Sequence, residues 1–183
     1  MRSIKNILLG LAGAASIISA TATFAQHAPT TFKVGETSFT RPTSWEWVEP
    51  ASALRKAQIK VKDASGKETA DIVFFQFGGS SGGAQANVDR WLGQFDEPVE
   101  KLNAKSESVT VGKTKITYVT AEGTYKSGMP GAPATPMANY GLIGAVVEPA
   151  DGNFIFIRFT GPKALAKSSI ADFKKMVQSG LKK

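Results

Sequence analysis

The chain has 183 residues, of which 42% are hydrophobic and 9% aromatic, and its formal net charge is +7. It contains no cysteine and one histidine, His27, which excludes disulfide bonds, Cys–His catalytic pairs and zinc sites built from these residue types. The length and the apolar content are those of one domain with its own hydrophobic core.

Residues 1–25 have the layout of a secretory signal peptide. Two basic residues open the chain, residues 7–18 are apolar and uncharged, and small residues lead up to Ala25. We expect cleavage after Ala25, with cleavage after Ala22 as the alternative. Removal of 25 of the 183 residues leaves 158 and lowers the net charge from +7 to +5, because two cations leave with the leader. We therefore expect a periplasmic or secreted protein without a transmembrane span.

A polar, flexible tail is expected at residues 26–31, and residues 32–183 are predicted to form a single domain. Residues 57–62 alternate between apolar and polar side chains, which is typical of a half-buried strand. A turn at residues 63–67 leads to residues 69–77, where both faces are apolar. This second segment is predicted to be a central strand that is covered on both sides.

The glycine-rich segment at residues 78–83 has the glycine spacing of a phosphate-binding loop. It lacks the lysine and the hydroxyl residue that would follow in such a loop, since alanine and glutamine stand there. We interpret it as an elbow between a strand and a helix, in which Ser80 or Ser81 caps the helix. The functional alternative is an anion site at the helix N-terminus, on the backbone of Gly82 and Gly83.

The apolar residues of the segment 84–95 recur at the spacing of one helical stripe. Trp91 belongs to this stripe and is predicted to be a core residue. Arg90, beside it, is a candidate binding residue that faces either solvent or a buried carboxylate. Trp45 and Trp47 are expected on one face of a sheet and in its core, with a carbohydrate or peptide platform as the alternative.

Four further strands are predicted at residues 106–111, 115–125, 140–147 and 154–159. Asp-Gly at residues 151–152 indicates a hairpin turn between the last two. A closing helix is expected to be capped by Ser168 or Ser169 and to end at Gly180. The order of elements predicts an α+β fold, with an antiparallel sheet of about six to eight strands flanked by helices.

Residues 126–137 contain three prolines and two glycines and are predicted to be an irregular loop. Long loops between strands are common places for binding residues. Tyr125 and Tyr140 stand on either side of this loop and Met129 lies within it. We therefore take Tyr125, Met129 and Tyr140 as candidate binding residues at one end of the sheet.

Several segments resemble a family of uncharacterised bacterial exported proteins: FTRPTSWEW, NVDRWLGQF, NYGLIGAVVE and FIFIRFTGP. More distantly, the layout is similar to PsbP-like domains, with a Pro-x-x-Trp element at residues 42–45 and a closing helix that includes residues 173–179. This resemblance implies an α-β-α sandwich that serves mainly as a binding or assembly accessory. It supplies no catalytic residues and no cofactor.

These patterns predict an exported, non-enzymatic domain that binds a partner protein or a small ligand of the cell envelope. No cofactor or metal site is expected. Specific nucleic-acid binding is not expected either, because the basic residues are scattered along the chain. One alternative is an envelope or polysaccharide-surface protein that uses its positive charge and exposed aromatic residues. A second alternative is a hydrolase with two catalytic carboxylates, which no local motif supports.

Overall fold

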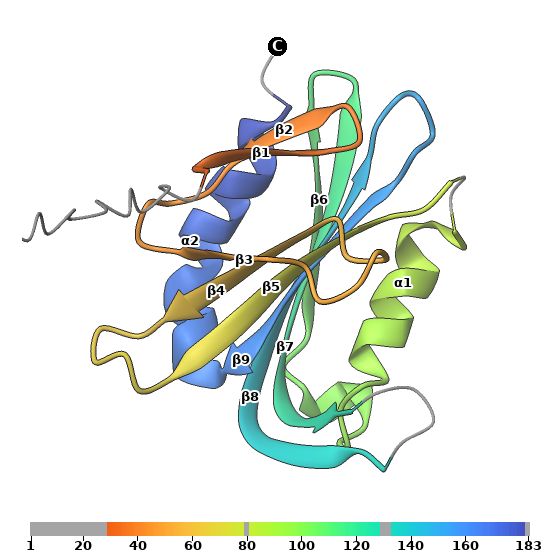
Figure 1. Cartoon of the computed structure of the whole chain (residues 1–183). Helices are drawn as coiled ribbons and strands as arrows, with labels where there is room; N and C mark the ends of the chain where they lie inside the picture. Colours follow the sequence, from red (N-terminus) through yellow and green to blue (C-terminus); the bar gives the residue numbers. More distant parts are fainter. Residues whose placement is uncertain (1–28, 79–80, 129–132, 182–183) are drawn as a thin grey trace, which may run out of the picture.

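The computed structural model describes residues 29–78, 81–128 and 133–181, and these form an α+β domain (Figure 1). The main sheet is antiparallel, and its seven strands lie in the order β3 (Glu46–Val48), β4 (Ala57–Lys62), β5 (Thr69–Gln76), β9 (Ile155–Pro162), β8 (Thr135–Glu148), β7 (Thr114–Ser127) and β6 (Lys105–Val111). The remaining elements are a hairpin of β1 (Thr31–Val34) and β2 (Thr37–Thr40), the helices α1 (Gly83–Leu92) and α2 (Lys163–Ser179), and the short η1 (Val99–Lys101). The predicted α+β fold with a sheet of six to eight strands is confirmed.

The two helices cover opposite faces of the sheet (Figure 1). Adjacent strand residues point to opposite faces, so Tyr118 belongs to the core under α2 and Val119 to the core under α1. The β1–β2 hairpin joins α2 in covering its face. Trp45 is buried and Trp47 half-buried in this same core, which confirms their predicted packing. Neither helix of the described residues combines the length and apolar character needed to cross a membrane.

Helix α1 lies on the sheet through Trp91, whose side chain is only 5% exposed. The strand β8 makes room for this ring with Gly144, where an added Cβ would lie 2.4 Å from Cζ3 of Trp91 and 2.8 Å from Cγ1 of Val119. A glycine at this position therefore allows the indole to approach the backbone of the sheet. The predicted core role of Trp91 is confirmed.

The elbow before α1 connects β5 to the helix as predicted, but its cap differs from the expectation. The residue at the N-cap is Gly82, with φ of 90°, and no side chain caps the helix. Ser81 therefore does not act as the cap, and Ser80 lies outside the described residues. The carboxamide of the fully buried Asn87 instead donates to the carbonyls of Ser81 and Gly83, at 3.1 and 2.7 Å. Glycine at position 82 permits the left-handed backbone with which the chain enters the helix.

The closing helix α2 ends at Gly180 as predicted but begins earlier than expected, at Lys163. Ser168 and Ser169 are therefore interior helix residues, and the Ser168 hydroxyl donates to the carbonyl of Leu165. Pro162 occupies the N-cap position with an extended backbone. A proline, rather than a serine, precedes the first helical residue, and at this position its missing N–H costs the helix no hydrogen bond.

Two sequence-based boundaries are wrong because strand pairing extends further than composition indicates. Thr31 belongs to β1 rather than to a tail. The segment 126–137 is not entirely irregular, because β7 runs to Ser127 and β8 starts at Thr135. Pro136 is accepted in β8 because β9 pairs with that strand only from Tyr140 onward, so Pro136 has a strand neighbour on one side alone.

Substitution of Gly144 by alanine should force the Trp91 indole away from β8. We expect the free energy of unfolding to fall by about 1–3 kcal/mol, the usual cost of overpacking a core. Chemical denaturation measures this change. Gly78→Ala is the control, since an added Cβ there meets nothing within 4 Å. Equal stability of the two variants would show that α1 is not seated on Gly144.

Candidate ligand-binding site

A charged residue, Arg158, stands in the middle of the sheet. Its strand, β9, is the fourth of the seven, and Ile157 and Phe159 on either side of Arg158 point into the core under α2. Arg158 therefore projects from the opposite face, the one on which α1 packs. It is paired with Val73 of β5 on one side and with Gly144 of β8 on the other.

The Arg158 side chain is largely shielded from water by the residues around it. Its Nη1 donates to Oε1 of Gln94 at 2.9 Å, whereas its Nε is buried and has no hydrogen-bond partner among the described residues. None of the ion pairs found in the described residues involves Arg158. Burial lowers the pKa of Arg158; Tyr125 opposes this shift, and the nearby charges of Arg55 and Arg90 add to it. A buried, unpaired donor costs about 1–3 kcal/mol, more when charged, so this site favours an added acceptor.

Gln94 organises the polar groups around Arg158. It lies just after α1, and its backbone carbonyl accepts a hydrogen bond from the N–H of Lys126 at 2.8 Å. Its side-chain oxygen accepts from the Tyr125 hydroxyl at 3.0 Å as well as from Arg158. One carboxamide thus connects the end of α1 with β7 and β9. Figure 1 shows the end of the β7–β8 hairpin beside the C-terminal end of α1.

These groups line a cavity of about 790 Å³ between the β3–β4 loop, β5, β9 and the loop end of the β7–β8 hairpin. We call it the arginine pocket and define it by six of its lining residues: Leu54, Arg55, Phe75, Gln94, Tyr125 and Arg158. Its volume is in the range of pockets that enclose small organic ligands. Leu54 is 64% exposed, so a solvent-exposed apolar side chain lines the same cavity as two arginines.

The charge of the arginine pocket is not balanced within the described residues. Arg55 donates through Nη1 to the amide oxygen of Gln58 at 2.9 Å rather than to a carboxylate. Lys126 lies on the same cavity and has only a distant, exposed ion pair with Asp96, at 3.8 Å. No carboxylate is among the described residues that line the cavity. Its field therefore attracts anions.

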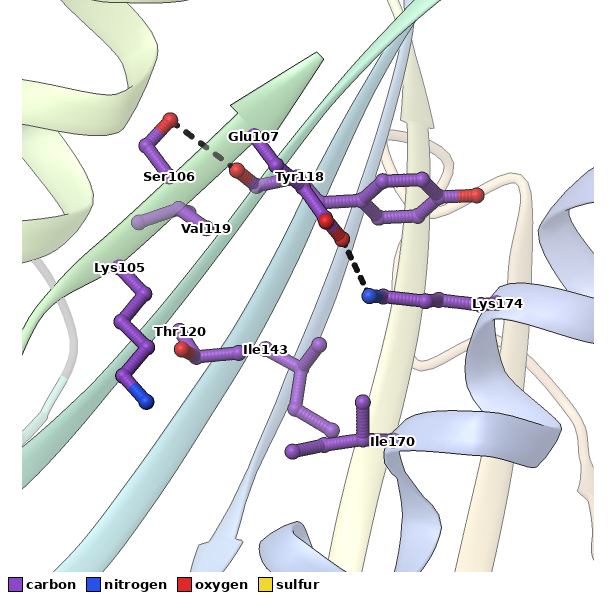
Figure 2. Close-up of a pocket in the computed structure, with 9 residues that line it drawn as sticks. All are labelled: Lys105, Ser106, Glu107, Tyr118, Val119, Thr120, Ile143, Ile170 and Lys174. Atoms are coloured by element: carbon purple, nitrogen blue, oxygen red, sulfur yellow. Dashed lines mark hydrogen bonds and ion pairs between the residues drawn. The ribbon is translucent and has the colours of Figure 1, made fainter. Parts of the chain in front are cut away.

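A second cavity, of about 510 Å³, lies on the other face between β6, β7 and α2 (Figure 2). It is lined by two lysines, Lys105 and Lys174, and by the carboxylate of Glu107. Lys174 forms an ion pair with Glu107 and lies over the ring of Tyr118, with Nζ 5.4 Å from the ring centre. Burial raises the pKa of Tyr118 to about 12. Because Lys174 already has a carboxylate partner, this cavity has less need of an anionic ligand than the arginine pocket.

The structure brings two of the candidate residues together. The rings of Tyr125 and Tyr140 stack with their centres 6.2 Å apart, and Tyr125 lines the arginine pocket. Arg90 is exposed and donates to the side-chain oxygen of Asn87 on its own helix. It does not line the pocket, although its charge acts on Arg158.

The other candidate positions stay predictions. Gly82 and Gly83 lie at the N-terminal end of α1. The side-chain amide of Asn87 donates to backbone carbonyls of this elbow. No second feature of the described residues indicates a ligand there. Met129 lies outside the described residues.

Of the six residues that define the arginine pocket, only Tyr125 was a sequence-based candidate; the polar residues that were missed are Arg55, Gln94 and Arg158. For Arg158 there was a signal, because a single charge interrupts the apolar run FIFIRF on a strand that is buried on both sides. Gln94 and Arg55 gave none. Their roles depend on the return of the chain after α1 and on the path of the β3–β4 loop, and neither follows from local periodicity.

Comparison of the chain with protein-family models and with curated proteins gives no match. In the described part of the chain, no group of three or more His, Cys, Asp or Glu side chains is placed to hold a metal ion. The interpretation of the site therefore depends on its geometry.

The position of Tyr125 depends on a carboxylate, Glu97. Both of its oxygens accept a hydrogen bond from the backbone N–H of Thr124, at 2.9 and 2.8 Å, where β7 has a bulge between Gly123 and Tyr125. This N–H lowers the pKa of Glu97. A lowered pKa in the folded state stabilises the protein above the ordinary Glu value of about 4.3, and this stability is lost as the pH falls through the folded value.

We therefore expect Glu97→Gln to lower the thermal unfolding midpoint at pH 7, and to do so progressively less as the pH falls from 5 to 3. The amide cannot lose or gain this proton, so the difference between the two proteins reports the carboxylate alone. Thermal melts at stepped pH values measure it. A difference that is independent of pH would mean that the carboxylate charge does not hold the bulge.

Proposed function

We propose that this protein is an exported, non-enzymatic binding domain that holds its ligand in the arginine pocket. The observation that carries the proposal is Arg158: a cation on the central strand, with a buried Nε that has no acceptor, lining a cavity of about 790 Å³. Buried polar groups in proteins are as a rule hydrogen-bonded, so a buried guanidinium donor without an acceptor favours a partner that enters the cavity. The leader-like residues 1–25 support export.

Binding rather than hydrolysis is favoured by the polar groups that are present. A glycoside hydrolase of the usual type needs one carboxyl group with a raised pKa to act as the acid. Among the described residues, four carboxyl groups have a shifted pKa, and each of these pKa values is lowered: Glu46, Asp63, Glu97 and Glu122. The arginine pocket offers donors from guanidinium, amide and phenol groups instead.

The polysaccharide-surface alternative has less support. A carbohydrate platform needs exposed aromatic rings, yet of the two rings considered for it Trp45 is only 5% exposed and Trp47 is half-buried against the same core. Helices on both faces of an antiparallel sheet are what a PsbP-like accessory domain would have. We extend the proposal to that class on the strength of this layering and of the resemblance in sequence.

The proposal is tested by capture of small molecules. The protein, exported with its own leader and purified without denaturation, is incubated with a small-molecule extract of a bacterial envelope and examined by native mass spectrometry. We expect the wild type to retain a ligand that Arg158→Met does not retain. Lys113→Met is the matched control, because this lysine is exposed in the β6–β7 turn and away from the pocket lining.

Retention by Lys113→Met and loss by Arg158→Met would support the proposal. Thermal melts of each variant confirm that it is folded. A ligand retained equally by all three proteins would place the binding elsewhere, and the absence of any retained molecule would contradict the proposed function.

A further inference from the structure

We infer that the ligand of the arginine pocket is an organic carboxylate with an apolar body, whose carboxylate sits on the Nε–Nη2 edge of Arg158. This inference rests on the proposed function and adds the chemical class of the ligand. It is carried by the hydrogen-bond pattern of one guanidinium, by the unbalanced charge around it and by the apolar wall beside it.

The first step is the orientation of the guanidinium. Gln94 accepts from Nη1 of Arg158, which commits that end of the group to the protein. The Nε is buried without a partner, and the described residues supply no acceptor for Nη2. The N–H groups of Nε and Nη2 are parallel and lie along one edge, and this is the fork that receives the two oxygens of a carboxylate.

The second step is the choice of a carboxylate over a phosphate. A phosphate presents three oxygens and calls for several donors, whereas Arg158 offers the one guanidinium edge of this pocket whose Nε is buried and has no partner among the described residues. The neighbouring donors are partly committed, since Arg55 donates through Nη1 to Gln58 and the Tyr125 hydroxyl donates to Gln94. The two oxygens of a carboxylate match the two parallel donors of the Arg158 edge.

The third step concerns the rest of the ligand. The volume of about 790 Å³ far exceeds the space that a carboxylate group needs, and the cavity is lined by Phe75 and by the exposed Leu54. The ring of Phe75 stacks on Phe77, with centres 6.1 Å apart, and Phe77 is itself 38% exposed. Apolar groups next to unpaired cations complement an amphiphilic anion, because the body is buried as the head is neutralised.

The test uses four probes below their micelle-forming concentrations: decanoate, decyl phosphate, decyltrimethylammonium and acetate. Isothermal titration calorimetry on the exported protein measures their affinities. We expect decanoate to bind more tightly than decyl phosphate, acetate to bind far more weakly than decanoate, and decyltrimethylammonium not to bind. Tighter binding of decyl phosphate would assign a phosphate head and overturn the carboxylate assignment.

Variants connect the affinity to the pocket. Arg158→Met should weaken decanoate binding at least about tenfold, because a charge-assisted pair of hydrogen bonds is lost. Arg158→Lys keeps the charge without the fork, and we expect an intermediate loss. Unchanged decanoate affinity in folded Arg158→Met would show that only apolar contact holds the probe, and would overturn the inference.

A second variant avoids any change inside the sheet. Leu54→Glu adds a negative charge at the pocket in an exposed loop, and we expect it to weaken decanoate binding at least about threefold through repulsion. Val99→Glu is the control, since Val99 is 49% exposed and does not line the pocket. Equal affinities in these two variants would contradict the placement of the carboxylate.

The two proposals can fail separately. If the envelope extract yields an Arg158-dependent ligand that is neutral or cationic, the binding function stands and the carboxylate inference fails. If decanoate binds as expected but no ligand is retained from the extract, the inferred chemistry stands and the proposed function fails.

Discussion

The hydrogen bond from Arg158 to Gln94 is the interaction on which the account of this protein depends. It joins the central strand of the sheet to the segment that follows α1, and the same Gln94 oxygen also receives the hydroxyl of Tyr125. This sharing determines which part of the guanidinium is used by the protein and which part is not. The strand β9 thus contributes a cation to a cavity, while its other residues form the core.

The architecture explains why such a cation can persist in the sheet. The contacts of α1 are with β7 and β8, through Trp91 over Gly144, so the helix covers one part of its face. Arg158 is paired with Gly144 on β8, at the border of this covered part, and the cavity opens toward β5 and the β3–β4 loop. The stability of the fold comes from the two apolar cores. The part of the α1 face that the helix leaves uncovered, next to the loops, is where we propose that a ligand binds.

Periodicity in the sequence was sufficient to predict most helices and strands and many of the core residues. The stripe that contains Trp91 and the apolar run of β5 predicted one packed helix and one central strand, because burial imposes those spacings directly. Helix caps and the ends of loops were harder to predict from the sequence. Gly82 replaced a serine cap, and pairing extended into the proline-rich segment at Thr135, because tertiary partners outweigh local preference. Gln94 joined the site only through the fold of the chain.

The most direct measurement of the central claim is the Nε–H resonance of Arg158 in ¹⁵N–¹H spectra, assigned through its loss in Arg158→Lys. If decanoate accepts a hydrogen bond from this Nε–H, its resonance should move downfield as decanoate is added. Its exchange with water should also slow. Decyltrimethylammonium should leave it unchanged. A resonance that does not respond to saturating decanoate would contradict the claim that this guanidinium receives the ligand.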